Sequence, residues 1–206
     1  RGLGDVYKRQ EQTRLETPLH LALSYDEEIG CVGVRSMIDM LAQAPFRPMF
    51  CIVGEPTSLA VATGHKGKTA LRVTCRGREA HSALAPQGLN AIYLATDMVA
   101  AIRELQAGLI EGAKARRSAS ADAGFDVPYT TLHVGTISGG EVLNIVPHQA
   151  QFLAEIRNLP DDDPDAILAD LRAAADALLA PLRTDFPEAA IVLEVTNSYP
   201  GLQTDE

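Results

Sequence analysis

Apolar and polar positions alternate regularly in the middle of the chain. Within residues 67–77 the apolar residues Leu71, Val73 and Cys75 alternate with the polar residues Arg72, Thr74 and Arg76. A period of two predicts a strand with one buried face. Extending this reasoning predicts six elements in order: strand 67–77, helix 88–106, strand 129–138, strand 145–157, helix 164–181 and strand 190–197. The order β-α-β-β-α-β is the split-βαβ pattern of a ferredoxin-like domain.

The residues before this domain predict a different arrangement. We expect a strand at 15–24, a helix at 31–44 and a strand at 50–53, and a β-α-β order favours a parallel sheet. Residues 1–10 fit neither a strand nor a helix, so we interpret them as an assembly artefact and leave them out of the fold. The expected fold class is α/β: a partial parallel-sheet domain followed by a complete ferredoxin-like domain.

Carboxylates follow both of the expected early strands. Asp26, Glu27 and Glu28 come after the first, and Glu55 comes after the second. The carboxyl ends of parallel strands meet at one edge of a sheet, where ligands bind. Like charges gathered there repel unless a cation neutralises them, and Zn²⁺ accepts carboxylate ligands. The alternative is that the acids only favour the positive end of a helix dipole, worth about 0.3–1 kcal/mol per charge.

Gly67, Lys68 and Thr69 imitate the end of a phosphate-binding loop. The first glycine of that motif would fall at position 62, which is Ala62, and the motif requires a helix after Thr69. The alternating pattern predicts a strand there instead. We therefore do not expect a nucleotide site.

The composition argues against a protein that binds nucleic acid or crosses a membrane. The chain has 206 residues, 46% of them hydrophobic, and a net charge of −9 without a basic cluster, which argues against a nucleic-acid partner. Its three cysteines, Cys31, Cys51 and Cys75, show no CxxC spacing, so reduced thiols in a cytoplasmic protein are expected. No apolar run approaches the roughly 20 residues of a membrane span, and we expect no membrane partner.

Three ordered motifs carry a family resemblance. They are Ser-Tyr-Asp-Glu-Glu-Ile-Gly-Cys at 24–31, Val-Gly-Glu-Pro-Thr at 53–57 and Gly-Gly-Glu-Val-Leu-Asn-Ile-Val-Pro at 139–147. From about residue 17 onward the chain resembles the M20 family of dizinc peptidases and deacylases, and within it most of all the acetylornithine deacetylases. The resemblance implies a partial catalytic zinc domain at 11–64, a lid and dimerisation domain at 65–197, and a truncated return to the catalytic domain at 198–206.

The resemblance also implies roles for the acidic residues. Glu27 would be the general acid and base, Glu28 and Glu55 terminal zinc ligands, and Asp26 a supporting group behind them. Two zinc ions would be bound, with cobalt as an alternative metal. The remaining ligands of the family, a His-x-Asp pair and a last histidine, would lie before residue 11 and after residue 206, so we expect the chain alone to be inactive.

Three residues of the lid acquire roles in the same way. From the residues alone, His81 is a surface or capping residue, Asn144 lies in a turn and Arg157 is exposed on a strand. The resemblance implies that His81 reaches the partner subunit's active site and stabilises an oxyanion, while Asn144 and Arg157 bind the substrate. A guanidinium suits a bidentate grip on a carboxylate. We assign no site role to the other histidines, which lack His-x-Asp or HExxH spacing: His20, His65, His133 and His148.

The implied function is hydrolysis of N-acetylornithine to ornithine and acetate, in arginine biosynthesis, by a cytoplasmic homodimer that acts on a small N-acyl amino acid. A succinyl-diaminopimelate desuccinylase or another M20 amidase is the alternative within the same chemistry. From a different class, the chain could be a non-catalytic dimerisation module.

Overall fold

Residues 16–117 and 124–204 are described by the computed structural model. They divide into two units, Arg1–Val53 and Gly54–Glu206, and each unit is described by itself. The interpretation of residues 1–10 as an artefact concerns residues outside the described part.

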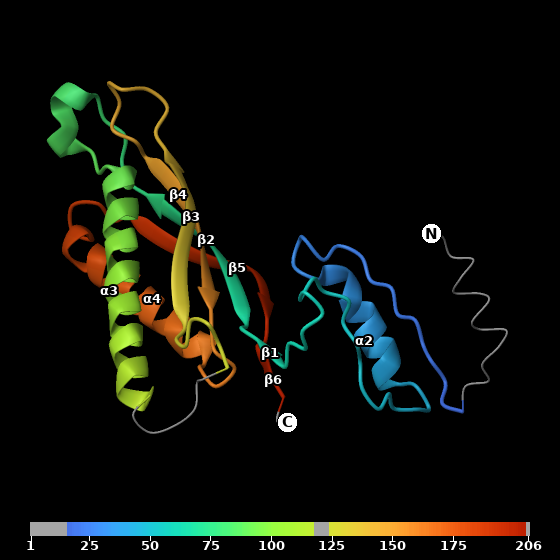
Figure 1. Cartoon of the computed structure of the whole chain (residues 1–206). Coiled ribbons are helices and arrows are strands. Elements are labelled where there is room, and N and C mark those ends of the chain that lie inside the picture. The colour runs from blue at the N-terminus through green and yellow to red at the C-terminus, as the bar shows by residue number, and fades with distance from the viewer. Residues whose placement is uncertain (1–15, 118–123, 205–206) are drawn as a thin grey trace. The chain divides into compact units, whose positions relative to one another are not determined.

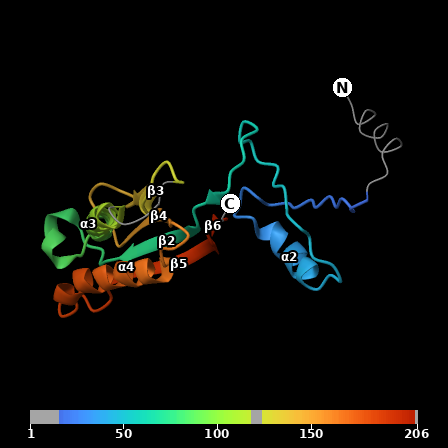
Figure 2. The same cartoon turned by 60° about the horizontal axis from the view of Figure 1, so that its bottom comes forward.

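Four antiparallel strands form the main sheet of the Gly54–Glu206 unit. In spatial order they are β3 (Thr131–Gly139), β4 (Gln149–Arg157), β2 (Lys68–Arg76) and β5 (Ala190–Tyr199). Two helices, α3 (Ala91–Arg117) and α4 (Pro164–Leu179), join β2 to β3 and β4 to β5. Figure 2 shows α3 beside β3 and β4, and α4 beside β5. The element order confirms the expected split-βαβ pattern.

One face of the sheet packs against the two helices and forms the core. On β2 and β4 every second residue is buried, among them Leu71, Val73, Phe152 and Ile156, each at most 2% exposed. Leu94, Met98 and Leu171 complete this core from the helices. The alternate residues of the strands lie on the opposite face, which we call the open face.

The sheet has two different ends (Figure 1). At one end, which we call the tip, the 3-10 helix η2 (Ser82–Gln87) follows β2, and the chain turns from β3 into β4. At the other, which we call the hinge end, the short strands β1 (Gly64–His65) and β6 (Leu202–Gln203) pair antiparallel.

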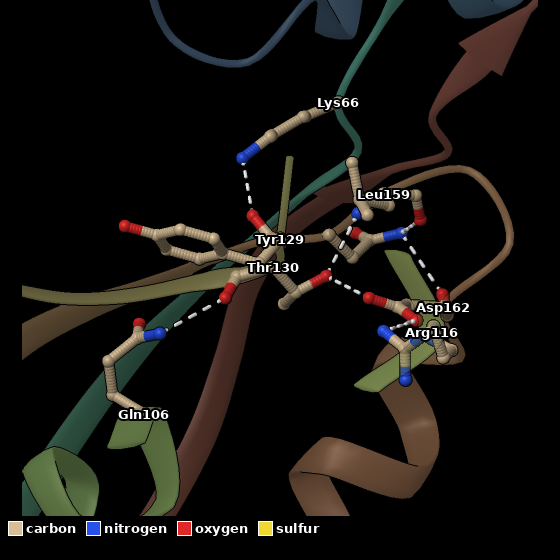
Figure 3. A network of polar contacts seen from close by, with 8 residues as sticks. Lys66, Gln106, Arg116, Tyr129, Thr130, Leu159 and Asp162 are labelled. Atoms are coloured by element: carbon tan, nitrogen blue, oxygen red, sulfur yellow. Dashed lines mark hydrogen bonds and ion pairs between the residues drawn. The ribbon is translucent and has the colours of Figure 1, made fainter. Parts of the chain in front are cut away.

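A partly buried polar network connects segments of the chain at the hinge end (Figure 3). The Thr130 hydroxyl donates to the Asp162 carboxylate and accepts the Leu159 amide at 2.9 Å, while Lys66 donates to the Tyr129 carbonyl at 2.6 Å. Burial lowers the pKa of Lys66, and the Asp162 charge opposes that shift. The network therefore fixes the start of β3 against the β4–α4 connection and the chain entering β2.

Helix α3 is longer than the sequence predicted. The prediction ended the helix at 106 and placed a loop at 112–124, whereas α3 runs to Arg117. Glycine costs about 1 kcal/mol in a helix, but the apolar stripe continues past Gly108 and Gly112 at spacings of three or four residues: Met98, Ile102, Leu105, Leu109 and Ala113. The remainder of the predicted loop, 118–123, lies outside the described residues.

The Arg1–Val53 unit corrects the prediction of a parallel sheet. Its described residues, 16–53, contain the 3-10 helix η1 (Val32–Val34) and the helix α2 (Arg35–Ala42), without a strand at 16–24 or 50–53. A strand needs a neighbour for its backbone groups, and those segments have no pairing partner in the described part of the chain. Their apolar side chains are exposed, Leu19 by 85% and Phe50 by 69%.

None of the helices in the described residues is both long enough and apolar enough to cross a membrane.

The core predicts the effect of truncating its largest side chain. Phe152→Ala should lower the free energy of unfolding by about 3–5 kcal/mol, because the ring is 1% exposed and its removal leaves a cavity. Phe50→Ala is the matched control and should change it by about 0.5 kcal/mol or less. Chemical denaturation followed by circular dichroism measures both, and equal effects would contradict the assignment of the core.

Candidate functional site

The first acidic loop is a tight turn. The Glu27 carbonyl accepts the amides of Gly30 at 2.9 Å and Cys31 at 3.0 Å, and Asp26 adopts a left-handed backbone conformation with φ of 57°. Aspartate tolerates that conformation better than most residues. The turn leaves Glu27 and Glu28 exposed as neighbouring carboxylates.

Glu55 lies exposed in the irregular segment that opens the Gly54–Glu206 unit, where its carbonyl accepts the Thr57 amide at 2.9 Å. The described residues contain no group of three or more His, Cys, Asp or Glu side chains that could hold a metal ion. Glu28 and Glu55 belong to different units, Arg1–Val53 and Gly54–Glu206, so their role as zinc ligands stays a prediction.

His81 and Asn144 come together at the tip. The Ser82 amide donates to the Asn144 carbonyl at 2.9 Å, and the Val146 amide donates to the Ala80 carbonyl at 2.8 Å. His81 itself pairs with Ile145 in an isolated bridge. Two predicted site residues 63 positions apart in the sequence are therefore neighbours.

The side chain of His81 caps the 3-10 helix η2. As N-cap of η2 it accepts the Ala83 amide on Nδ1 at 3.1 Å. A neutral imidazole that accepts at Nδ1 must carry its proton on Nε2. The exposed side chain thus offers an Nε2–H donor beyond the tip.

The glycine pair at the tip is required by the backbone. Gly140 has φ of 75°, a left-handed conformation that favours glycine, and a Cβ on Gly139 would meet the Ala150 Cβ at 2.7 Å. A cavity of about 450 Å³ borders this turn. Its wall includes Glu79 and His148, paired at 3.5 Å, a contact that the sequence did not predict.

Arg157 lies at the hinge end of β4. Its Nε donates to the Glu155 carboxylate at 3.1 Å and its Nη1 donates to the Tyr199 hydroxyl at 3.2 Å. Burial opposes the charged form, but the Glu155 contact outweighs it, with help from Tyr199, and the pKa of Arg157 is raised. The guanidinium is a permanent cation in a fixed orientation.

The length of β4 separates the two groups of predicted substrate residues. Asn144 precedes this nine-residue strand and Arg157 ends it. At about 3.3 Å per residue the strand alone spans about 26 Å. A small amino-acid derivative cannot contact Asn144 and Arg157 of the same copy.

Comparison with known proteins identifies the class. Residues 63–183 match the M20 peptidase dimerisation domain, which covers more than half of the chain. The chain belongs to the M20 family.

Curated relatives of this M20 chain are named acetylornithine deacetylase. The protein from Salmonella arizonae is 33% identical over 199 residues, covering 97% of this chain and 48% of the relative. The protein from Myxococcus xanthus is 32% identical over 191 residues, covering 93% and 47%. The M20 chain therefore spans about half the length of the curated relatives it matches.

Solved structures share the fold of the M20 chain. A hydantoinase/carbamoylase family amidase from Burkholderia ambifaria superposes with a TM-score of 0.55 at 18% identity, covering 70% of this chain and 31% of the other. Aminopeptidase PepT from Bacillus cereus gives 0.50 at 22% identity, covering 70% and 33%. At these identities the likeness concerns the fold alone.

The contact between Ala83 and His81 predicts the tautomer of the free ring. In the neutral ring, ¹⁵N chemical shifts of His81 should show a protonated Nε2 and an unprotonated Nδ1, because the Ala83 amide already donates to Nδ1. His133, exposed on β3, serves as the comparison ring in the same spectrum. A protonated Nδ1 at His81 would contradict the tip geometry.

Proposed function

We propose that the Gly54–Glu206 unit serves as lid and dimerisation domain of an M20 amidohydrolase that converts N-acetylornithine to ornithine and acetate. The observation that carries the proposal is the 33% identity to acetylornithine deacetylases, which extends over 97% of the chain. A desuccinylase of succinyl-diaminopimelate, or another M20 amidase, is the second candidate, since Arg157 would fit any N-acyl amino acid with a free carboxylate.

His81 would act on the oxyanion that forms when the amide carbonyl is attacked. A hydrogen-bond donor aimed at charge that develops in the transition state accelerates acyl transfer. The Ala83 amide favours the Nε2–H form that such a donor needs. Asn144 lies next to it and would hold the acyl amino acid.

The substrate would be held between two copies of the chain. Because about 26 Å separates the ends of β4, Asn144 and His81 of one copy can share a small substrate only with Arg157 of the other. Arg157 would bind the α-carboxylate. The proposed substrate site would therefore be complete only in the dimer.

Dimerisation would use the outer edge of β3. This strand lies at the end of the sheet order, so its outer backbone groups have no strand partner in the described residues. A groove of about 450 Å³ runs between β3 and α3 and is lined mainly by apolar side chains, among them Val99, Ile102, Ile110, Leu132 and Val134. An edge strand beside an apolar groove suits an isologous contact with a second copy.

The acidic loops would belong to the metal centre of such an enzyme. Glu28 and Glu55 would each offer one carboxylate to zinc, and Glu27 would move the proton from water to the leaving amine. Asp26 would support them from behind. The other ligands would have to come from outside the described residues.

The dimer proposal predicts the effect of a charge in the groove. Ala107 is an exposed helix residue on the groove wall, so Ala107→Glu should leave the fold intact and weaken dimerisation by about tenfold or more, because a longer, charged side chain would have to lose its water in an apolar interface. Ala100→Glu, on the same helix outside the groove, is the matched control. Analytical ultracentrifugation of the chain measures both, and a monomeric wild type would exclude this interface.

The catalytic proposal is tested in a chimera. Residues 16–204 replace the matched half of the Myxococcus xanthus relative, and hydrolysis of N-acetylornithine should exceed that of succinyl-diaminopimelate. Glu27→Ala should reduce turnover by about 100-fold or more with the zinc content nearly kept, whereas Glu28→Ala should lose metal. Glu16→Ala is the control.

Equal zinc loss in Glu27→Ala and Glu28→Ala would refute their separate roles. A folded, dimeric chimera that binds zinc without turnover on either substrate would favour the non-catalytic dimerisation module.

A further inference from the structure

Charged and polar side chains gather on the open face at the hinge end of the sheet. Strand register places Lys68 opposite Tyr199 and His133 opposite Glu155, and Arg157 shares their face two residues after Glu155. Directly opposite residues of an antiparallel pair point to the same side. We call Lys68, Glu155, Arg157 and Tyr199 the hinge-end patch.

A bulge in β5 brings Tyr199 into this patch. The β2–β5 register shifts between Ala70 and Leu71, because Thr196 is an extra residue on β5. Before the bulge the odd-numbered residues of β5 face the helices; after it they face the open side. Thr196 donates to the Ala70 carbonyl at 3.3 Å, and Thr69 and Ser198 bond through their hydroxyls at 3.1 Å. Bulges commonly re-aim a side chain in this way.

The contacts within the patch orient Arg157. Glu155 engages Nε and Tyr199 engages Nη1, so Nη2 has no partner among the described residues. The Tyr199 ring also contacts His65 edge-on, at 6.4 Å between ring centroids. The Arg157 side chain lies on the open face and remains 37% exposed.

The patch differs from an ordinary surface ion pair in its charge. Lys68 lies 3.8 Å from Glu155, so two cations share one carboxylate. On the same face Arg72 pairs with Glu194 at 3.1 Å, one cation to one carboxylate, and both are more exposed. The hinge-end patch keeps a surplus positive charge, a free donor edge and a hydroxyl.

We propose that Lys68, Arg157 and Tyr199 bind one carboxylate of the substrate together and that Glu155 is the positioning residue that fixes the guanidinium. The inference rests on the proposed role of Arg157 and extends it to three further residues. Lys68 supplies a second charge, Tyr199 holds Nη1 in place, and Glu155 prevents rotation about the guanidinium while leaving Nη2 for the ligand.

The test uses the ¹⁵N-labelled 206-residue chain titrated with N-acetyl-L-ornithine and, separately, with its methyl ester. The acid should shift the Arg157 Nε–H signal and the ester should not. Tyr199→Phe should weaken binding of the acid about five- to tenfold, and Lys68→Met should do the same while Lys68→Arg restores it. Glu155→Gln should speed rotation of the guanidinium, seen as broadening of the Arg157 signals.

Matched controls separate this patch from a structural ion pair. Glu194→Gln breaks the neighbouring pair and Tyr93→Phe removes an exposed hydroxyl on α3, and neither should change binding. Equal shifts with acid and ester, no shift with either, or full affinity in Tyr199→Phe would overturn the proposal.

The same variants in the chimera test the proposed hydrolase activity and the proposed carboxylate site separately. Tyr199→Phe should raise the KM for N-acetylornithine with kcat nearly unchanged. A chimera that fails to hydrolyse the substrate while the chain still binds it through Arg157 refutes the proposed activity and leaves the patch standing. Turnover with a KM that does not respond to Tyr199→Phe refutes the patch alone.

Discussion

The burial of one face of β2 and β4 under two helices is the constraint on which the rest of the molecule depends. Leu71, Val73, Phe152 and Ile156 must point to the helices, and strand alternation then forces their neighbours to the open face. Polar residues on that face are therefore displayed in fixed rows. The same packing makes the sheet a rigid spacer between the tip and the hinge end.

The sheet keeps the polar groups of the tip apart from those of the hinge end. His81 and Asn144 are held by backbone hydrogen bonds at the tip, whereas Arg157 is held by Glu155 and Tyr199. Each set is held by contacts at its own end of the sheet, so one set can form without the other. A function that needs both sets must bring two ends of different copies together, which links catalysis to assembly.

Much of the second unit could be predicted from the sequence because its strands alternate and its helices carry apolar stripes. The prediction was wrong where contacts with distant parts of the chain determine the local structure. In α3 the packing of the apolar stripe outweighs the low helix propensity of Gly108 and Gly112. The apolar run 19–23 forms no strand, because it has no neighbouring strand in the described residues. The family resemblance singled out His81, Asn144 and Arg157 as candidates, whereas the contact of Arg157 with Tyr199 follows from the register between strands. Register cannot be read from one strand alone.

The extra residue in β5 has a consequence for reading related sequences. A relative that keeps every residue of β5 but pairs it without the bulge would continue the simple alternation, so the position aligned with Tyr199 would turn inward and the one aligned with Ser198 would face the open side. An ungapped alignment would then compare residues on opposite sides of the sheet. A relative that lacks the residue aligned with Thr196, by contrast, would keep the position aligned with Tyr199 on the open face, because the deletion also removes the bulge.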